Sequence, residues 1–267
     1  MMTAGVSTAC FYPMETKDAL HCLLEGGVKQ AEVFLNAPTE AGEPYLEGLR
    51  ELCRQHEAGI VSFHPFTSEM ETLFFFSNYP YRFQDGLVYY RKLFAAAQRL
   101  GARYFVLHGE FAMSRLPLEE SCRRVLELRK VAREGYGVEL LQENVQRCKG
   151  GRPEYWDALL QREPEQRFVL DIKQALRAGQ DPFVFAQLAG GQIAHLHLSD
   201  NAPGRDCLPL GEGTFDLAGL LTLLRRQGFD GSAVVELYRH SYQDVGQIFQ
   251  SYQNLCRLLN QPSGSST

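Results

Sequence analysis

The sequence predicts a single (β/α)8 TIM barrel, an α/β fold with parallel strands, from three observations. Its 267 residues fit the roughly 250 that one such barrel needs. Short apolar runs alternate with longer amphipathic runs along the whole chain, and eight short runs can be counted. This alternation is typical of a parallel sheet, which eight units close most economically into a barrel; an open, doubly wound sheet is the alternative. We assign residues 1–260 to the barrel and 261–267 to a disordered tail.

The strands are predicted where four to eight apolar or β-branched residues occur together. In chain order they are expected at residues 5–9, 31–35, 59–63, 103–108, 138–142, 167–171, 193–198 and 232–237. Between them, apolar residues recur at helical spacing, most clearly at 43–58, 86–101, 118–135 and 215–229. Several of these stretches end at or just before a glycine, as helices often do: Gly59, Gly101, Gly135 and Gly228.

Two connections are longer than usual. Residues 64–86 follow the third strand and residues 199–216 follow the seventh. In a barrel both would lie at the carboxyl ends of the strands, where active sites are built. The first of these contains an aromatic run, residues 73–83, which we expect either to form an apolar wall or lid over a sugar or to pack against a neighbouring helix or subunit.

Composition and charge argue against several classes of protein. The formal net charge is −5 with no basic run, which disfavours a nucleic-acid partner. No apolar stretch approaches the length of a membrane span, and the amino-terminal residues lack the basic start and apolar run of a signal peptide. Seven scattered cysteines form no C-x-x-C pair, so reduced thiols in a cytoplasmic protein are expected.

Ionisable side chains lie within most predicted strands or close to their carboxyl ends. They are Glu32, His64, His108, Glu143, Asp171, His197 and Glu236. Parallel strands direct these ends to one rim, and converging carboxylates repel one another unless a cation neutralises them. A mixture of carboxylate and imidazole ligands suits Mn²⁺, Mg²⁺, Co²⁺ or Zn²⁺ without selecting one. His195, by contrast, is expected to face the surrounding helices, away from His197.

The same segments resemble the xylose-isomerase-like superfamily of TIM barrels, which includes sugar and sugar-phosphate isomerases and epimerases, inosose dehydratases and family 2 apurinic endonucleases. The similar segments are AEVFL, SFHPF, YFVLHGEF, LLQENV, FVLDIKQALRAG, HLHLSDN, LPLGEGTFD and AVVELY, in the expected order. The resemblance implies that Glu143, Asp171, His197 and Glu236 bind one divalent metal ion. It further implies that Glu143 and Glu236 move protons on a small carbohydrate through a metal-stabilised enediolate.

Other positions are implied to contact the substrate: His64, His108, Lys173, Gln174 and Arg205. Two of them depart from the family pattern, in which many members have Asp-x-x-His after strand six. Here Gln174 replaces the histidine, and Lys173 adds a cation that could bind an anionic group, act as an acid, or form a salt bridge with Asp171. In the endonucleases the loop after strand seven supplies a further Asp and His, where this chain offers Arg205 and Cys207.

The function predicted from these residues is therefore isomerisation or epimerisation of a small sugar, sugar phosphate or related polyol ketone. An inosose-dehydratase-like lyase would use the same groups. A metal-dependent phosphodiester hydrolase and a barrel that binds a ligand without chemistry are the alternatives from other classes. No other cofactor is expected, and a homo-oligomer is compatible with the sequence.

Overall fold

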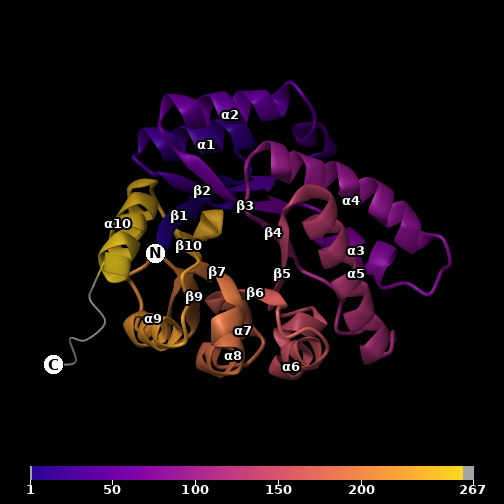
Figure 1. The fold of residues 1–267 in the computed structure, drawn as a ribbon. Coiled ribbons are helices and arrows are strands. Elements are labelled where there is room, and N and C mark those ends of the chain that lie inside the picture. Colours follow the sequence, from indigo (N-terminus) through magenta and orange to yellow (C-terminus); the bar gives the residue numbers. More distant parts are fainter. Residues whose placement is uncertain (1, 261–267) are drawn as a thin grey trace.

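The structure, a computed structural model, describes residues 2–260 as a closed barrel of eight parallel strands (Figure 1). In order around the barrel the strands are β1 (Thr3–Ser7), β10 (Ser232–Val235), β7 (Ile193–Leu198), β6 (Arg167–Asp171), β5 (Glu139–Glu143), β4 (Tyr104–Leu107), β3 (Gly59–Pro65) and β2 (Gln30–Leu35). Val6 of β1 pairs with Val235 on one side and with Ala31 on the other, which closes the ring. The predicted fold class is confirmed, and the predicted tail lies outside the described residues.

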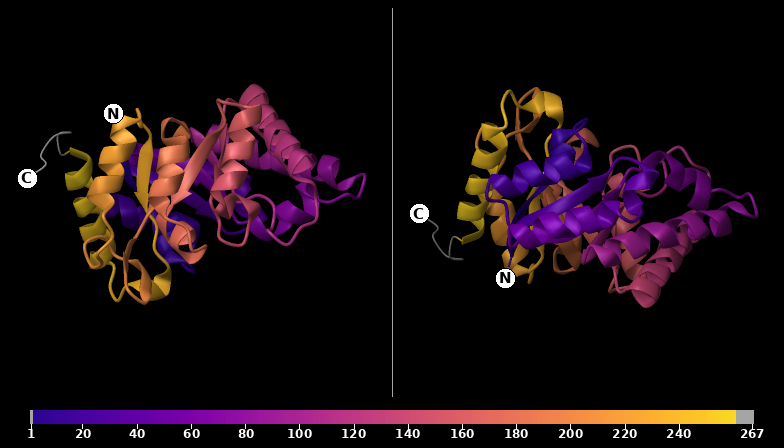
Figure 2. Two further views of the ribbon diagram at one scale, coloured as in Figure 1. Left: turned by 90° about the horizontal axis from the view of Figure 1, so that it is seen from below. Right: turned by 90° about the horizontal axis from the view of Figure 1, so that it is seen from above.

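Helices surround the strands, as the further views in Figure 2 also show. They are α1 (Thr16–Glu25), α2 (Tyr45–Gln55), α3 (Ser68–Phe75), α4 (Arg82–Arg99), α5 (Leu118–Tyr136), α6 (Pro153–Arg162), α7 (Ile172–Arg177), α8 (Pro182–Ala189), α9 (Leu217–Arg226) and α10 (Gly246–Asn260). Short 3-10 helices are η1 (Thr8–Phe11), η2 (Pro38–Ala41), η3 (Lys149–Gly151), η4 (Gly190–Gln192) and η5 (Arg239–Ser241).

Glycines end some of the helices as the sequence predicted. Gly101 and Gly228 follow α4 and α9 closely and have positive φ. The prediction that α5 ends at Gly135 is wrong, because the helix continues past this residue. Its cap is Gly137, whose φ of 67° is the left-handed conformation that glycine adopts without strain. Gly59 is the first residue of β3 and not a helix end.

The barrel interior has an apolar layer below a polar one. Tyr104, Val106, Leu141 and Val169 form a small buried cluster on β4, β5 and β6. Residues two apart on a strand share a face. Glu143 therefore shares the face of Leu141, one step closer to the carboxyl end of β5. The larger apolar core lies between the barrel and the helices.

The two long connections carry secondary structure of their own. The first contains α3, and Phe75 of its aromatic run packs against α4, where its ring meets that of Tyr90 edge-on at 4.6 Å. Tyr79 and Tyr81 of the same run are exposed. The second forms the antiparallel pair β8 (Asp200–Ala202) and β9 (Arg205–Leu208). Within residues 2–260, no helix combines the length and apolar character needed to cross a membrane.

Candidate active site

The four side chains predicted to bind a metal lie together at the carboxyl ends of their strands, and all are buried. His197 stands at the centre. Its Nδ1 atom is 3.1 Å from Oε1 of Glu143, 3.6 Å from Oε2 of Glu236 and 3.9 Å from Oδ2 of Asp171. The predicted convergence is therefore present, because β5, β6, β7 and β10 are consecutive around the barrel and run parallel.

Local interactions fix the direction of Asp171. It is the last residue of β6 and the amino-terminal cap of α7, where its Oδ1 atom accepts a hydrogen bond from the Gln174 amide at 3.0 Å. The side chain of Asn144 donates to the Asp171 carbonyl at 2.8 Å and accepts from its amide at 2.7 Å. This clamp gives the Glu-Asn motif after β5 a structural role, and it leaves Oδ2 of Asp171 directed at the cluster.

Glu32 lies fully buried beneath the cluster. Its Oε2 atom accepts hydrogen bonds from Ser62 at 2.8 Å, from His195 at 3.1 Å and from Nε2 of His197 at 3.0 Å. Oε1 of Glu143 lies 3.1 Å from Nδ1 on the other side of the ring, so carboxylates face both nitrogens of His197. Glu32 therefore orients His197.

The expectation that His195 faces the outer helices is wrong. His195 is fully buried, and its ring contacts Ser232 at 2.6 Å through Nδ1 as well as Glu32 through Nε2. Residues two apart on a strand point to the same side, so the inward direction of His197 required the same of His195. His195 belongs to the hydrogen-bonded layer below the cluster.

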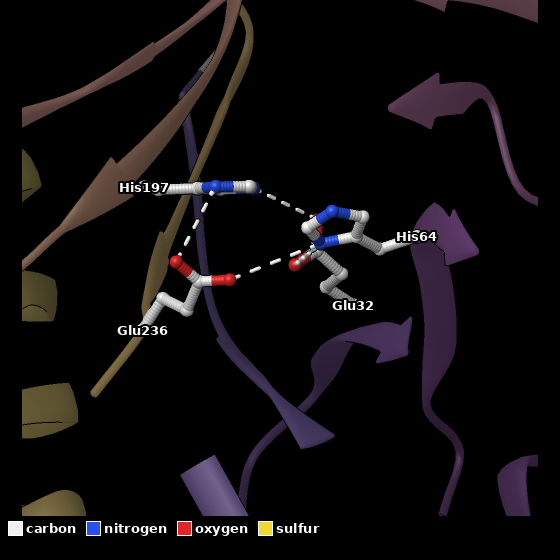
Figure 3. A group of neighbouring side chains, drawn as sticks. All are labelled: Glu32, His64, His197 and Glu236. Atoms are coloured by element: carbon white, nitrogen blue, oxygen red, sulfur yellow. Dashed lines mark hydrogen bonds and ion pairs between the residues drawn. The ribbon is translucent and has the colours of Figure 1, made fainter. Parts of the chain in front are cut away.

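His64 and His108 complete the rim. Their Nε2 atoms are 2.7 Å apart, and Nε2 of His108 is 3.0 Å from Oε2 of Glu143. His64 Nδ1 approaches Oε1 of Glu32 at 3.6 Å and Oε1 of Glu236 at 3.8 Å, and Figure 3 shows His64, Glu32, Glu236 and His197 pointing toward one another. Neither Nδ1 atom has a hydrogen-bond partner, so both can bind a further group.

Lys173 occupies the space between two of the predicted ligands. Its ammonium donates to Oδ2 of Asp171 at 2.5 Å and also to Oε2 of Glu236, and its side chain is 2% exposed. Of the roles left open for Lys173, the structure shows the salt bridge. It includes Glu236 as well as Asp171, which the sequence did not indicate.

Neighbouring charges set the ionisation of the cluster. Burial raises the pKa of Glu143, but the charges and hydrogen bonds of His108 and His197 outweigh it and hold the pKa well below its ordinary value. The pKa of Glu32 is lowered in the same way, mainly by His197. Burial lowers the pKa of His197, yet the charges of Glu32 and Glu236 raise it well above its ordinary value. The imidazoles therefore balance these carboxylates.

The ionisation of the other two carboxyl groups, Asp171 and Glu236, depends on Lys173. Burial lowers the pKa of Lys173, but Asp171 and Glu236 outweigh burial and raise it well above its ordinary value. Burial raises the pKa of Glu236, but the charges of Lys173 and His197 outweigh burial and lower it below its ordinary value. Burial raises the pKa of Asp171 to about 6 even though Lys173 opposes the change, because Glu236 and Glu143 repel a further negative charge.

A cavity of about 470 Å³ opens above the cluster. Six predicted site residues line it: His64, His108, Glu143, Lys173, Gln174 and Glu236. Arg205 is exposed on β9 and is not among the residues that line it. Sequence reasoning missed other lining residues: Tyr12, Phe34, Asn36, Arg147, Arg177 and Tyr238.

One of the missed residues had a signal in the sequence. Arg177 lies four residues after Lys173 on α7, so the helix places both side chains on one face. It pairs with Asp206 and donates to the hydroxyl of Tyr238 at 3.1 Å. The cations that line the cavity are thus Lys173 and Arg177 of α7 together with Arg147, and not Arg205.

The donor atoms suit a divalent cation. Glu143, Asp171 and His197 each offer one ligand atom within 4.8 Å of the others, and so do Glu32, His64, His197 and Glu236. Oε1 of Glu32 is buried without a hydrogen-bond partner, so it has capacity for another positive neighbour. Carboxylate oxygen and imidazole nitrogen are ligands for Mn²⁺, Mg²⁺, Co²⁺ and Zn²⁺. The residues present therefore fit the ion.

The acidic residue of the H-x-x-D-N motif does not belong to this set. Both carboxylate oxygens of Asp200 accept backbone hydrogen bonds, from Asn201, Gly211 and Phe215. A side chain at Gly213 would meet Oδ1 of Asp200 at 2.3 Å, which accounts for the second glycine of the L-G-E-G motif. Asp200 shapes the loop after β7 and is not directed at the cluster.

Comparison with known proteins is consistent with this geometry. The family model described as xylose isomerase-like TIM barrel matches residues 24–258. No curated protein sequence matches the chain. Among solved structures it is similar to a D-tagatose 3-epimerase-like protein, with 19% identity, 97% of each chain covered and a TM-score of 0.80.

Two further solved structures have the same fold. One is a D-allulose 3-epimerase from Methylomonas sp. in complex with D-allulose, with 14% identity, 96% of each chain covered and a TM-score of 0.76. The other is a 3-keto-D-glucoside 4-epimerase from E. coli, with 14% identity, coverage of 98% of this chain and 100% of that chain, and a TM-score of 0.74. At these identities the likeness is one of fold.

Proposed function

The chain belongs to the xylose isomerase-like TIM barrel family, and on that premise we propose that it is a divalent-metal-dependent isomerase or epimerase of a small sugar, sugar phosphate or related polyol ketone. One observation carries the proposal. Glu143 and Glu236 line the same cavity from strands three places apart around the barrel, with Asp171 and His197 on the two strands between them.

Glu143, Asp171, His197 and Glu236 would hold the ion. When bound, it would supply positive charge to substrate oxygens on which negative charge develops as a neighbouring proton leaves. With the ion bound, Glu32 would hold the proton of His197 at Nε2 and leave Nδ1 to the ion.

The two glutamates would carry the proton transfer. One glutamate, as a carboxylate, would remove the proton next to the carbonyl of a bound ketone, and the other, as a protonated carboxyl group, would donate its proton to the opposite face or to the neighbouring carbon. Removal and return from opposite faces gives an epimer, and return to the neighbouring carbon gives an isomer. His64 and His108 line the cavity, where their imidazoles would hydrogen-bond to substrate hydroxyls.

The phosphodiester hydrolase is the weaker alternative. It would require additional metal ligands from the loop after β7, but Asp200 is occupied by backbone amides and Cys207 is buried, with its thiol against the amide of Tyr238. A dehydratase would use the same two glutamates, and its product would differ by the loss of water.

The experiment is a screen of ketoses in deuterated water with analysis of the products. The wild-type protein loaded with a divalent ion should place solvent deuterium on a carbon beside the carbonyl, and Glu143→Gln and Glu236→Gln should each reduce turnover by a factor of about 10²–10⁴. The matched control is Glu139→Gln, at the opposite end of β5 and paired with Arg129 outside the cavity. Retained turnover in both cavity variants would refute the assignment of proton transfer.

A further inference from the structure

Lys173 and a divalent ion would need the same two oxygen atoms. Oδ1 of Asp171 accepts the hydrogen bond of the Gln174 amide in the first turn of α7, and Lys173 Nζ is bonded to Oδ2, the oxygen nearer to His197. The same ammonium is bonded to Oε2 of Glu236, the oxygen nearer to His197. An ion that takes all four proposed ligands therefore meets a resident positive charge at the position it must occupy.

The ammonium of Lys173 can take a second position inside the cavity. Lys173 lines the cavity, and its Nζ is 5.4 Å from the centre of the Tyr238 ring, whose face attracts cations. Rotation of the lysine side chain away from the carboxylates would carry the charge into the cavity, which Tyr238 and Gln174 also line. No change of the backbone is needed, because the side chain alone has several rotatable bonds.

We propose that Lys173 is an internal counter-ion which holds Asp171 and Glu236 together when no divalent ion is bound, and that the ion displaces its ammonium into the cavity. This inference rests on the ligand set of the proposed function. It has two consequences. Lys173 lowers the affinity for the ion, since two like charges compete for two oxygens, and the ammonium faces substrate only in the ion-loaded site.

The first test compares ion affinities. Calorimetric titration with Mn²⁺ should show that Lys173→Met and Lys173→Gln bind the ion at least about tenfold more tightly than the wild type, because a unit charge is removed from a few ångströms away. Arg177→Met is the matched control. It removes an equal charge from the same helix and cavity, but Arg177 bonds to Asp206 and Tyr238 and not to the proposed ligands. Its effect should be the smaller one.

The second test uses the wild-type protein and does not depend on the folding of a variant. Acetic anhydride should leave Lys173 unmodified in the ion-free protein and should acetylate it once Mn²⁺ is bound, as peptide mass spectrometry would show. The buried ammonium is otherwise shielded by its two carboxylates.

The outcomes separate this inference from the proposed function. Mn²⁺ binding of equal strength in wild type and both Lys173 variants, with unchanged acetylation, would overturn the displacement and leave the metal site standing. Failure of all the proteins to bind Mn²⁺, Mg²⁺, Co²⁺ or Zn²⁺ would overturn both the displacement and the ligand set. Tighter Mn²⁺ binding in the Lys173 variants, together with acetylation of Lys173 when the wild type binds Mn²⁺, would support the displacement, whichever sugar proves to be the substrate.

Discussion

Replacing Glu71 with glutamine should change how the free energy of unfolding depends on pH. Glu71 lies on α3, and its carboxyl group is 1% exposed. It accepts a hydrogen bond from the amide of Gly109 at 2.5 Å and another from the hydroxyl of Tyr90 at 3.0 Å. Burial raises its pKa to about 7, against the partial opposition of His108 and these two donors.

The size of the effect follows from the difference between this pKa of about 7 and the ordinary value of 4.5. That difference corresponds to about 3 kcal/mol. Because the pKa is raised in the folded protein, the folded state holds the proton more tightly than the unfolded chain. The resulting stability is fully present below the unfolded pKa and is lost as the pH rises through about 7.

Glutamine does not titrate, so Glu71→Gln removes the loss of stability that the wild type undergoes as the pH rises. The stability of the variant relative to the wild type should increase by about 2 kcal/mol between about pH 5 and pH 8. Urea unfolding of both proteins at several pH values measures this difference, and the subtraction cancels groups that titrate in both. Tyr90→Phe is the companion variant. It removes a donor that lowers the pKa of Glu71, so the change should move to higher pH.

A stability difference that is constant from about pH 5 to pH 8 would refute the reasoning. It would mean that the buried carboxyl is already ionised in the folded protein at the lower pH. The Gly109 amide and His108 would then outweigh burial, contrary to the balance of these effects derived from the structure.

Three other substitutions test the site and its support. Glu32→Gln should weaken divalent-ion binding by about 10–100-fold, measured by calorimetry, because His197 loses the charge that orients it. Asn144→Ala should lower the free energy of unfolding in urea by about 1–3 kcal/mol, because it removes two hydrogen bonds to the backbone of Asp171. Trp156→Ala should lower it by about 3–5 kcal/mol in the same assay, because this fully buried ring stacks on a phenylalanine of β6.

The sequence was sufficient for the barrel and for the convergence of its acidic residues. Both depend on regularities of the backbone: the alternation of short and long apolar runs, and the common direction of parallel strands. Glu143, Asp171, His197 and Glu236 lie at or next to the carboxyl ends of neighbouring strands, so their meeting at one rim required no knowledge of side-chain contacts. Their roles as ion ligands and proton carriers stay predictions.

Side-chain partners across the barrel could not be predicted in the same way. The bond from Lys173 to Glu236 joins residues 63 apart in the chain, and no local pattern signals it. Asn144 likewise clamps Asp171 from 27 residues away. The position of His195 was within reach of the sequence, since strand alternation alone places it on the same face as His197.

The bridging position of Lys173 also bears on the departure from Asp-x-x-His. Four carboxylates are buried here, and each is stable as an anion only beside a positive or hydrogen-bonding partner. Glu32 and Glu143 have imidazoles, but Asp171 and Glu236 share one ammonium. Gln174, in the place of the histidine, accepts a hydrogen bond from the amide of Gln146 and adds no charge. Lys173 therefore supplies the charge that this half of the cluster needs, and restoring a histidine at position 174 alone would leave the ammonium between the two carboxylates.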